Sequence, residues 1–473
     1  MQDDKKIVGY LPDERPPVWK LILYALQQVI VMFPATVAVA IITGFHISTT
    51  IFASGLATLC FILVTGRKIP LYYGSSFSYV TAIGSLMALE ELSGYSLDDK
   101  IAMAQFGIVM SGFVSIIAGL IVKQFGKESI EKVLPAHITG PIAMVIGLTL
   151  AGTAIEDSQS IFRGVDEQGD AVLAAGNNAQ SMALVVGLIT LIATILFSVY
   201  LKGIWGQLPL ILGPMVGCLA AFIIYLTADV NLFKIVPAAI QDNGLFALPN
   251  ITFPKPNMRA VVAIMPIALA TIPESTAHIY QLDIYVKDLA RKKNSEKKYD
   301  LASKLGLNLI GDGIGDIVAG AIGGPAGTNY GENISAMAIT RVFSVHVLVV
   351  AALISMLIAC FTPLISIIYA IPAAVIGGLE IYLFGAIAAQ GVAIMVEKKV
   401  DMFSAKNIAV MACIMVIGLG GNYGFGGTGN IPFFGLDIPC VATAAIFGIL
   451  LNLVLSIGDW VKKRKVQETV ENA

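Results

Sequence analysis

The sequence predicts an all-α integral membrane protein with 14 transmembrane segments in two inverted repeats of seven. Composition, apolar runs and a weak internal repeat support this prediction. Of the 473 residues, 56% are hydrophobic and only 13% are charged, whereas a soluble protein carries about 25% charged residues. This deficit indicates that most of the surface faces lipid. A formal net charge of −2 also gives no reason to expect a nucleic-acid partner.

Long apolar runs define the expected segments. A helix needs roughly 20 mostly apolar residues to cross a bilayer. Segments three and ten are the weakest as continuous helices, because they contain Gly, Ser, Thr or Asn where a lipid-facing helix would have Leu. The 14 runs are 18–43, 48–66, 70–89, 101–122, 133–153, 180–201, 207–228, 259–286, 302–323, 326–343, 344–365, 368–396, 405–421 and 437–460.

Basic residues predict the orientation. With 14 crossings and a cytoplasmic start, five of the 30 Lys and Arg residues fall outside, which leaves 25 on the cytoplasmic side. The five are Lys100, Arg163, Lys234, Lys255 and Arg259. This bias is the one that the positive-inside rule describes. We therefore expect residues 1–17 and 461–473 to be cytoplasmic, and the first 20 residues show no cleavable signal peptide.

Short identities indicate the internal repeat. Gly66 and the Tyr73–Ser76 run match Gly323 and the Tyr330–Asn333 run at an offset of 257. The Pro-Ala…Gly pattern that starts at Pro135 recurs at an offset of 237. The matches place segments two, three and five over segments nine, ten and twelve. Seven is an odd number, so the two halves must enter the membrane from opposite sides, as in many transporters.

Two acids stand out within apolar runs. Glu332 lies in segment ten and Glu274 in segment eight. An acid at the bilayer centre costs about 2.5–3.5 kcal/mol, so such groups usually face a cavity and bind something. Interrupted segments at corresponding positions of two halves also indicate a midplane binding site. The alternative for Glu332 is that it only caps the helix that begins there.

The segment-ten run from Glu332 to Arg341 resembles the characteristic motif of the nucleobase/ascorbate transporter family, also called nucleobase:cation symporter-2. Among its members, the chain is most similar to bacterial uracil permeases. Supporting similarities lie at 13–17, 74–77, 311–313 and 329–331, and the resemblance spans residues 13–460. Two positions depart from the family, since Gln28 and Ser275 stand where members often have His.

The resemblance implies a division into a core domain and a gate domain. It also implies short extended strands in segments three and ten, and members are often dimers through the gate domain. The core domain would contain 18–122 (segments 1–4) and 259–365 (segments 8–11), and the gate domain 133–228 (segments 5–7) and 368–460 (segments 12–14).

The function implied by the resemblance is secondary active import of uracil, by proton symport, across the inner (cytoplasmic) membrane. Glu274 and Glu332 would accept hydrogen bonds from the base. Backbone groups of Phe77 and Gly331 would contact its polar edge, and His278 would join Glu274 in proton coupling. From the residues themselves, Phe77 and Tyr330 could supply the apolar packing that a flat base needs. No cofactor is expected.

Several alternatives remain open at the level of sequence. His278 could be a satisfied core histidine. Asp312 and Asp316 lie four residues apart and fit a proton relay, a cation site or support for broken backbone. Glu380 is unusual in segment twelve and has no assigned role. Rival functions are symport of xanthine or another nucleobase, including sodium-coupled symport, and an anion transporter or channel of related fold. An enzyme would need a nucleophile or metal set, and none stands out.

Overall fold

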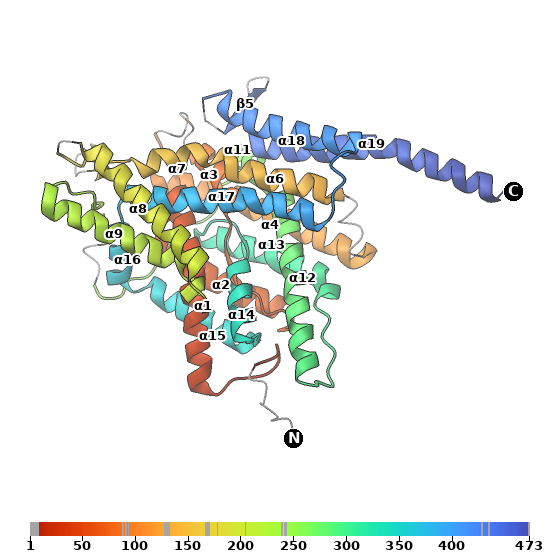
Figure 1. The fold of residues 1–473 in the computed structure, drawn as a ribbon, viewed down its shortest axis with the longest axis horizontal. Helices are drawn as coiled ribbons and strands as arrows, with labels where there is room; N and C mark the ends of the chain where they lie inside the picture. Colours follow the sequence, from red (N-terminus) through yellow and green to blue (C-terminus); the bar gives the residue numbers. More distant parts are fainter. Residues whose placement is uncertain are drawn as a thin grey trace.

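The computed structural model describes residues 9–87, 89, 92, 94–126, 133–165, 171–176, 178–203, 205–237, 240, 244–426, 429–433 and 436–471. Helices α6, α7, α17 and α18 run side by side across the upper part of Figure 1, and α1, α12, α14 and α15 lie below them. Helix α19 (Cys440–Glu471) extends away from the rest of the molecule and continues past residue 460, where the sequence analysis ended the last segment.

Eleven helical stretches in the described chain are long and apolar enough to cross a membrane. They coincide with predicted segments 1, 2, 4–9 and 12–14, so the chain is a multi-pass membrane protein. Their helices are α1 (Val18–Thr43), α2 (Ile47–Val64), α4 (Leu97–Phe125), α6 (Ala136–Thr149) with α7 (Ala151–Ser158), α8 (Ala179–Tyr200), α9 (Pro209–Ala228), α11 (Met258–Ile264) through η4 (Met265–Ile267) into α12 (Ala268–Lys292), η5 (Ala302–Lys304) with α13 (Leu305–Ile322), α17 (Ala373–Glu397), α18 (Ala405–Tyr423) and α19.

The three remaining segments contain shorter helices. Segment three consists of strand β1 (Tyr73–Ser75), the 3₁₀ turn η1 (Phe77–Tyr79) and α3 (Val80–Met87), and segment ten of strand β4 (Gly327–Asn329) and α14 (Gly331–Thr340). Segment eleven contains α15 (Val345–Ala359) and, after it, the short helix α16 (Thr362–Tyr369). The strands expected in segments three and ten are therefore confirmed, and the count of 14 crossings stays a prediction.

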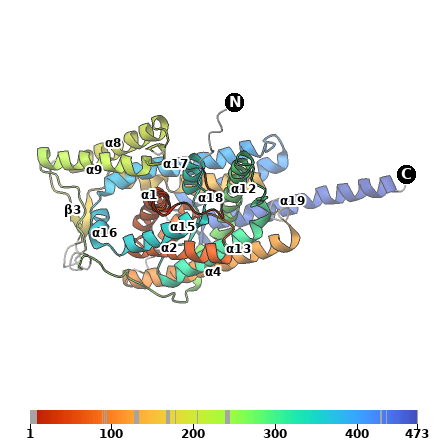
Figure 2. The same ribbon diagram turned by 90° about the horizontal axis from the view of Figure 1, so that it is seen from below.

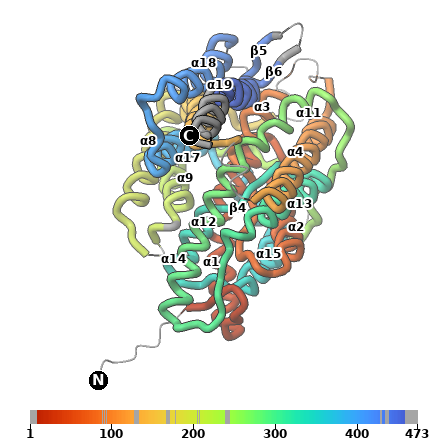
Figure 3. The backbone as a smooth tube through the Cα atoms, turned by 90° about the vertical axis from the view of Figure 1, so that its right-hand side faces the viewer, coloured from red at the N-terminus to blue at the C-terminus, as the bar shows by residue number. Residues whose placement is uncertain are grey.

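Strands β1 and β4 pair antiparallel in the interior, with Gly74 opposite Thr328. Figure 3 shows β4 between α12 and α13. The edges of this short ladder are satisfied by side chains, since Ser54 of α2 donates to the Tyr73 carbonyl (2.7 Å) and Tyr73 N–H donates to Thr58 (3.0 Å). Because non-helical backbone at this depth has no water to bond, such partners make the interruption tolerable.

The elements of segments three and ten align with each other differently from the sequence match. The strands begin at Tyr73 and Gly327 and the following helical turns at Phe77 and Gly331, which is an offset of 254 in both cases. Gly66 and Gly323, which both have positive φ, keep the offset of 257 read from the sequence. The connection from glycine to strand is thus three residues longer in the first half, and the sequence match misplaces Tyr73 on Tyr330.

Close helix contacts build the body around this ladder. Helix α13 packs against α4 and α2, and α15 packs against α1 and α2. Helix α17 packs against α6, α7 and α8, while α8 and α9 lie together at one side of the molecule (Figure 2). Glycines allow the closest approach: a Cβ on Gly112 of α4 would lie 2.5 Å from the Gly313 carbonyl of α13. Small residues at such interfaces are typical of membrane helices.

Two further hairpins were not predicted. Strand β2 (Phe162–Val165) pairs with β3 (Ala171–Leu173), and β5 (Asn430–Phe433) pairs with β6 (Leu436–Pro439). Both lie in connections between helices, so they leave the mostly helical class of the fold unchanged.

Candidate functional site

Glu332 lies in the first turn of α14, directly after the strand pair. Its carboxylate sits deep inside the protein, yet its side chain keeps an accessible surface. The first N–H groups of a helix lack partners within the helix, and Tyr330 at the N-cap position of α14 bonds none of them with its side chain. The Glu332 carboxylate interacts with the N–H of its own residue, so the alternative in which Glu332 caps α14 stays a prediction.

Glu274 approaches the same region from α12. Its carboxylate interacts with the Ser78 hydroxyl of η1 and with the charge of Glu332. The side chain of Glu274 is partly accessible, like that of Phe77. The two acids thus lie near each other inside the molecule, beside the ends of both interrupted segments.

His278 and Gly331 are in direct contact. A Cβ on Gly331 would lie 2.9 Å from Nε2 of His278, so this glycine lets α12 and α14 approach closely. His278 is only 7% exposed, and its Nδ1 has no hydrogen-bond partner among the described residues. The imidazole is therefore placed between Glu274, one helical turn earlier, and the start of α14. The imidazole also interacts with the Asn329 backbone, so a core histidine and a functional one both stay predictions.

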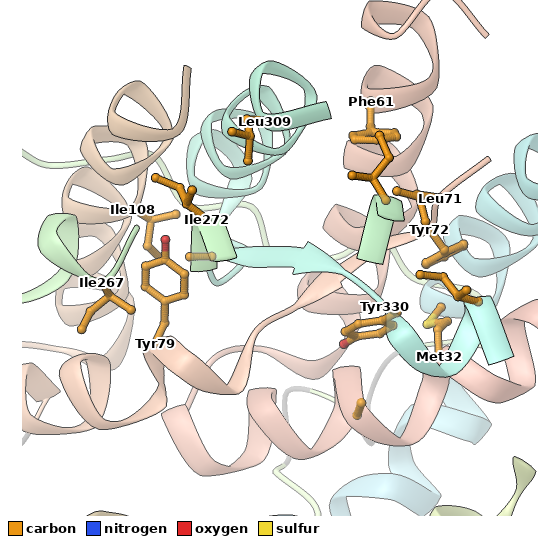
Figure 4. Close-up of a cluster of buried hydrophobic side chains, with 14 of the residues drawn as sticks. Met32, Phe61, Leu71, Tyr72, Tyr79, Ile108, Ile267, Ile272, Leu309 and Tyr330 are labelled. Carbon is orange, nitrogen blue, oxygen red and sulfur yellow. The ribbon is translucent and has the colours of Figure 1, made fainter. Parts of the chain in front are cut away.

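The two expected aromatic residues have different environments. The Tyr330 hydroxyl donates to the Ser75 carbonyl (2.9 Å) and lies 3.0 Å from the Thr36 hydroxyl. Its ring covers Gly74 and is 4% exposed, and Figure 4 shows it beside the strand. Phe77 instead keeps accessible surface and makes an edge contact with Phe384 of α17, with ring centroids 6.3 Å apart. Phe77 thus offers the freer aromatic surface.

Asp316 holds both strands of the ladder. Its Oδ1 accepts a hydrogen bond from the Tyr73 hydroxyl (2.5 Å) on β1 and another from the Gly327 N–H (2.9 Å) on β4. The carboxylate is 1% exposed. These contacts support the structural alternative for Asp316, namely that it satisfies interrupted backbone.

Asp312 belongs to a second network between α12, α13 and β4. It accepts hydrogen bonds from the Ser275 hydroxyl and from the Asn329 amide, the latter at 2.7 Å. Asn308 donates to Ser275 (2.7 Å) and accepts from Asn329 (3.3 Å). Ser275 follows Glu274 directly, so this network fixes the turn of α12 that presents the acid.

The region contains no metal centre in the described chain, because no group of three or more His, Cys, Asp or Glu side chains lies together there. What it offers instead is two acids, a helix N-terminus, an accessible aromatic ring and an unpartnered imidazole nitrogen. Such a set is suited to holding a small, flat, polar molecule with N–H donors.

Residues 19–427 match a family model described as a permease family. The chain belongs to the nucleobase/ascorbate transporter family. It is 34% identical to a uracil permease of Bacillus caldolyticus, over 93% of each chain. It is 30% identical to the uracil permease of Escherichia coli strain K12, over 97% of each chain, and 30% identical to that of Bacillus subtilis strain 168, over 95% of this chain and 96% of the relative. These relatives are permeases, not enzymes.

Solved structures of anion transporters share the fold of this family member. A structure of murine solute carrier 26 family member A9 in the inward-facing state has a TM-score of 0.65 at 13% identity, over 94% of this chain and 69% of that chain. The transmembrane domain of the cyanobacterial bicarbonate transporter BicA has a TM-score of 0.57 at 14% identity, over 86% and 97%. Identities this low speak for the fold alone.

In this nucleobase/ascorbate transporter, three contacting residues escaped the sequence analysis as site residues. Ser78 interacts with Glu274. Asn333 donates to the side-chain oxygen (2.8 Å) and backbone carbonyl (2.9 Å) of Gln28, which ties the second residue of the motif to α1. The signal for Gln28 and Asn333 was present, because both are amides in apolar runs. A serine hydroxyl gives no comparable signal, because membrane helices commonly contain it.

Proposed function

We propose that this permease imports uracil by proton symport across the cytoplasmic membrane. The observation that carries the proposal is the convergence of Glu274 and Glu332 beside the N-terminus of α14. Uracil has two N–H donors and two carbonyl acceptors on a flat ring. Two carboxylates accept from the N–H groups, and free backbone N–H groups donate to the carbonyls.

Each site residue has a role in this proposal. Glu274 and Glu332 accept hydrogen bonds from the base, and backbone groups of Phe77 and Gly331 meet its polar edge. Phe77 packs on one face of the ring. Tyr330 acts mainly by shaping the wall, since its ring and hydroxyl are engaged with β1.

Proton coupling is assigned to Glu274 and His278. Two ionised carboxylates that share a water-poor space repel each other, and a proton on one of them removes that repulsion. His278 stands at the contact between α12 and α14 with a free ring nitrogen, so it can exchange that proton. The core domain, once it is loaded and protonated, then moves past the gate domain more easily than with both acids charged.

The proposed architecture retains 14 crossings in two inverted halves. The antiparallel β1–β4 pair supports it, because strands at equivalent positions of inverted halves meet in this way. Segments 1–4 with 8–11 form the proposed core domain and segments 5–7 with 12–14 the gate domain. The packing of α17 on α6–α8 and of α13 on α2 and α4 supports this division. We place both termini in the cytoplasm and expect a homodimer.

Binding and transport test the proposal separately. We expect uracil, in a panel of nucleobases, to raise the unfolding temperature of the purified permease most, and Glu274→Gln to abolish most of that rise. Reconstituted vesicles should accumulate labelled uracil only while a proton gradient is present. Accumulation that survives a protonophore but requires sodium would assign the coupling to sodium. Stabilisation by xanthine alone would assign another cargo.

An anion carrier of related fold is the alternative from another class. It needs a basic or neutral centre, whereas two acids meet here and repel anions. Stabilisation by bicarbonate or sulfate, without any by nucleobases, would support that alternative.

A further inference from the structure

Glu380 is buried on α17 with an exposed fraction of 0%. Neither of its carboxylate oxygens has a well-formed hydrogen bond among the described residues. A buried carboxylate without a partner is expensive unless it is neutralised. Glu380 is outside the proposed uracil site, and the mechanism above does not use it.

Two charged groups lie beside Glu380. Asp157, near the end of α7, and Lys234, in the connection after α9, both interact electrostatically with it. The contact with α7 is close, because a Cβ on Gly377, one turn before Glu380, would lie 2.1 Å from the Ser158 nitrogen. The place of Lys234 is fixed as well, since its backbone N–H donates to the Ala370 carbonyl at 3.1 Å.

The inventory of charges around Glu380 is short. Helices α8 and α9 contain no Asp, Glu, Lys, Arg or His, and α6 contains only His137, which bonds to Asn452 of α19. Helix α7 adds Glu156, whose side chain is exposed and whose charge reaches Asp157. Burial lowers the pKa of Lys234, while the Asp157 and Glu380 carboxylates oppose this change.

Charge balance identifies the missing partner. Arg163 lies next to Lys234 in the structure and its Nε donates to the Phe233 carbonyl (2.9 Å). With both carboxylates ionised, Asp157, Glu380 and charged Lys234 carry a net charge of −1. One proton makes the group neutral. Lys234 already provides the positive charge that a metal cation would supply, and the described residues contain no cluster of three potential ligands. The partly accessible Asp157 gives a proton from water a way to reach the buried Glu380.

We propose that Asp157 and Glu380 bind one proton between them, opposite Lys234, as a second proton site between α7 and α17. The proton comes from water, adds to one carboxylate oxygen and returns to water when it leaves. Phe384, one turn after Glu380 on α17, is the residue that contacts Phe77. The second site is therefore connected by one helical turn to the proposed substrate site.

Proton titration of the purified permease tests this site without any transport. We expect the wild type to bind about one proton more per molecule than Glu380→Gln across the neutral range, and to show an infrared band of a protonated carboxylic acid that the variant lacks. Asp157→Asn should have the same effect, which covers the case in which Glu380→Gln does not fold. Glu156→Gln is the matched control, because it removes an exposed acid from the same helix.

Titration curves of wild type and both variants that coincide would overturn the proposal. So would sodium ions that displace the proton from the wild type but leave Glu380→Gln unaffected. Lys234→Met should move the wild-type curve to higher pH, since the positive charge that competes with the proton for the two carboxylates is then gone. If uracil uptake is proton-driven as proposed, Glu380→Gln should also flatten its pH dependence while uracil still stabilises the protein. A titration difference between wild type and Glu380→Gln, in a protein that takes up no uracil, would refute the proposed function and still support the proton site.

Discussion

The two interrupted segments enter the same strand ladder but begin their helices differently. In segment three, Ser76 caps the turn at Phe77, since Ser78 N–H donates to the Ser76 hydroxyl (3.2 Å). In segment ten, the N-cap residue Tyr330 makes no such bond with its side chain, and the second residue of α14 is the accessible acid Glu332. One helix start thus has a neutral serine cap, whereas the other has an acid in its first turn.

This difference shows how two segments that pair in one ladder can begin their helices with groups of different charge. Antiparallel pairing places the two helix starts at opposite ends of one short ladder, so the positive end of each helix is directed back toward the ladder. The short Ser76 cap closes one start with a neutral group. The longer Glu332 projects a charge instead, at a cost in stability that a bound base with N–H groups can offset.

The largest expected effect comes from Glu332→Gln. A hydrogen bond to a charged group contributes about 1.5–3 kcal/mol, so uracil should bind roughly 10- to 150-fold more weakly. The unliganded protein should unfold at the same or a higher temperature, because a costly charge is gone. Isothermal titration and thermal unfolding of the purified protein measure the two effects.

Ser76→Ala is the matched variant on the other helix start. Loss of an N-cap costs about 1 kcal/mol of stability, and uracil affinity should change little. Equal losses of affinity in both variants would mean that the two helix starts are not functionally different.

Gly74→Ala should have the next largest effect. Its Cβ would lie 2.3 Å from the Tyr330 ring, so the ring must move and its hydrogen bonds to Ser75 and Thr36 are disturbed. Overpacking of this kind costs about 1–3 kcal/mol. The control is Gly84→Ala in α3, where no atom lies within 4 Å and alanine favours the helix by roughly 0.5–1 kcal/mol. Thermal unfolding in detergent should therefore shift in opposite directions, and a stable Gly74→Ala variant would contradict the assigned packing.

The sequence predicts much of this fold because burial in lipid leaves a strong pattern. Eleven apolar runs reappear as spanning helices, and the polar interruptions at segments three and ten mark the strands. Glu332 and Glu274 are conspicuous for the same reason, since an ionised group in an apolar run needs an explanation. The proposed functional roles came from the resemblance to the family, because charge and spacing alone do not identify a nucleobase.

The register of the ladder could not be predicted. The Tyr73-Gly74 and Tyr330-Gly331 identities suggest an alignment that differs by three residues from that of the strand starts, because the connection before each strand has a different length. Asp316 bonds to both strands only in that register. The sequence alone therefore could not decide whether Asp316 is a proton relay, a cation ligand or a structural acid. Glu380 interacts with Asp157 of α7 and with Lys234 of a connecting segment, and both are far from it in the sequence. No local sequence pattern predicts these contacts.

The smallest effect is expected at the ends of the helices that carry the two acids. The N-terminal segment bonds to the end of α14, where Tyr10 N–H donates to the Arg341 carbonyl (2.9 Å), and to the loop after α12, where Asp13 pairs with Lys297 (2.6 Å). Burial alone would raise the pKa of Asp13, but hydrogen bonds from Lys297 and Tyr299 outweigh it and hold the pKa below its usual 3.8.

A lowered folded-state pKa means that the Asp13 contacts stabilise the protein above pH 3.8 and that this contribution is lost as the pH falls below it. Asp13→Asn should therefore lower stability at neutral pH, by about 0.5–1 kcal/mol because the pair is half-exposed, and should change nothing in strong acid. Glu296→Gln, an exposed acid on the same loop, is the control. Chemical unfolding at several pH values measures this difference, and the absence of any penalty for Asp13→Asn at neutral pH would show that the N-terminal segment is held by other contacts than its carboxylate.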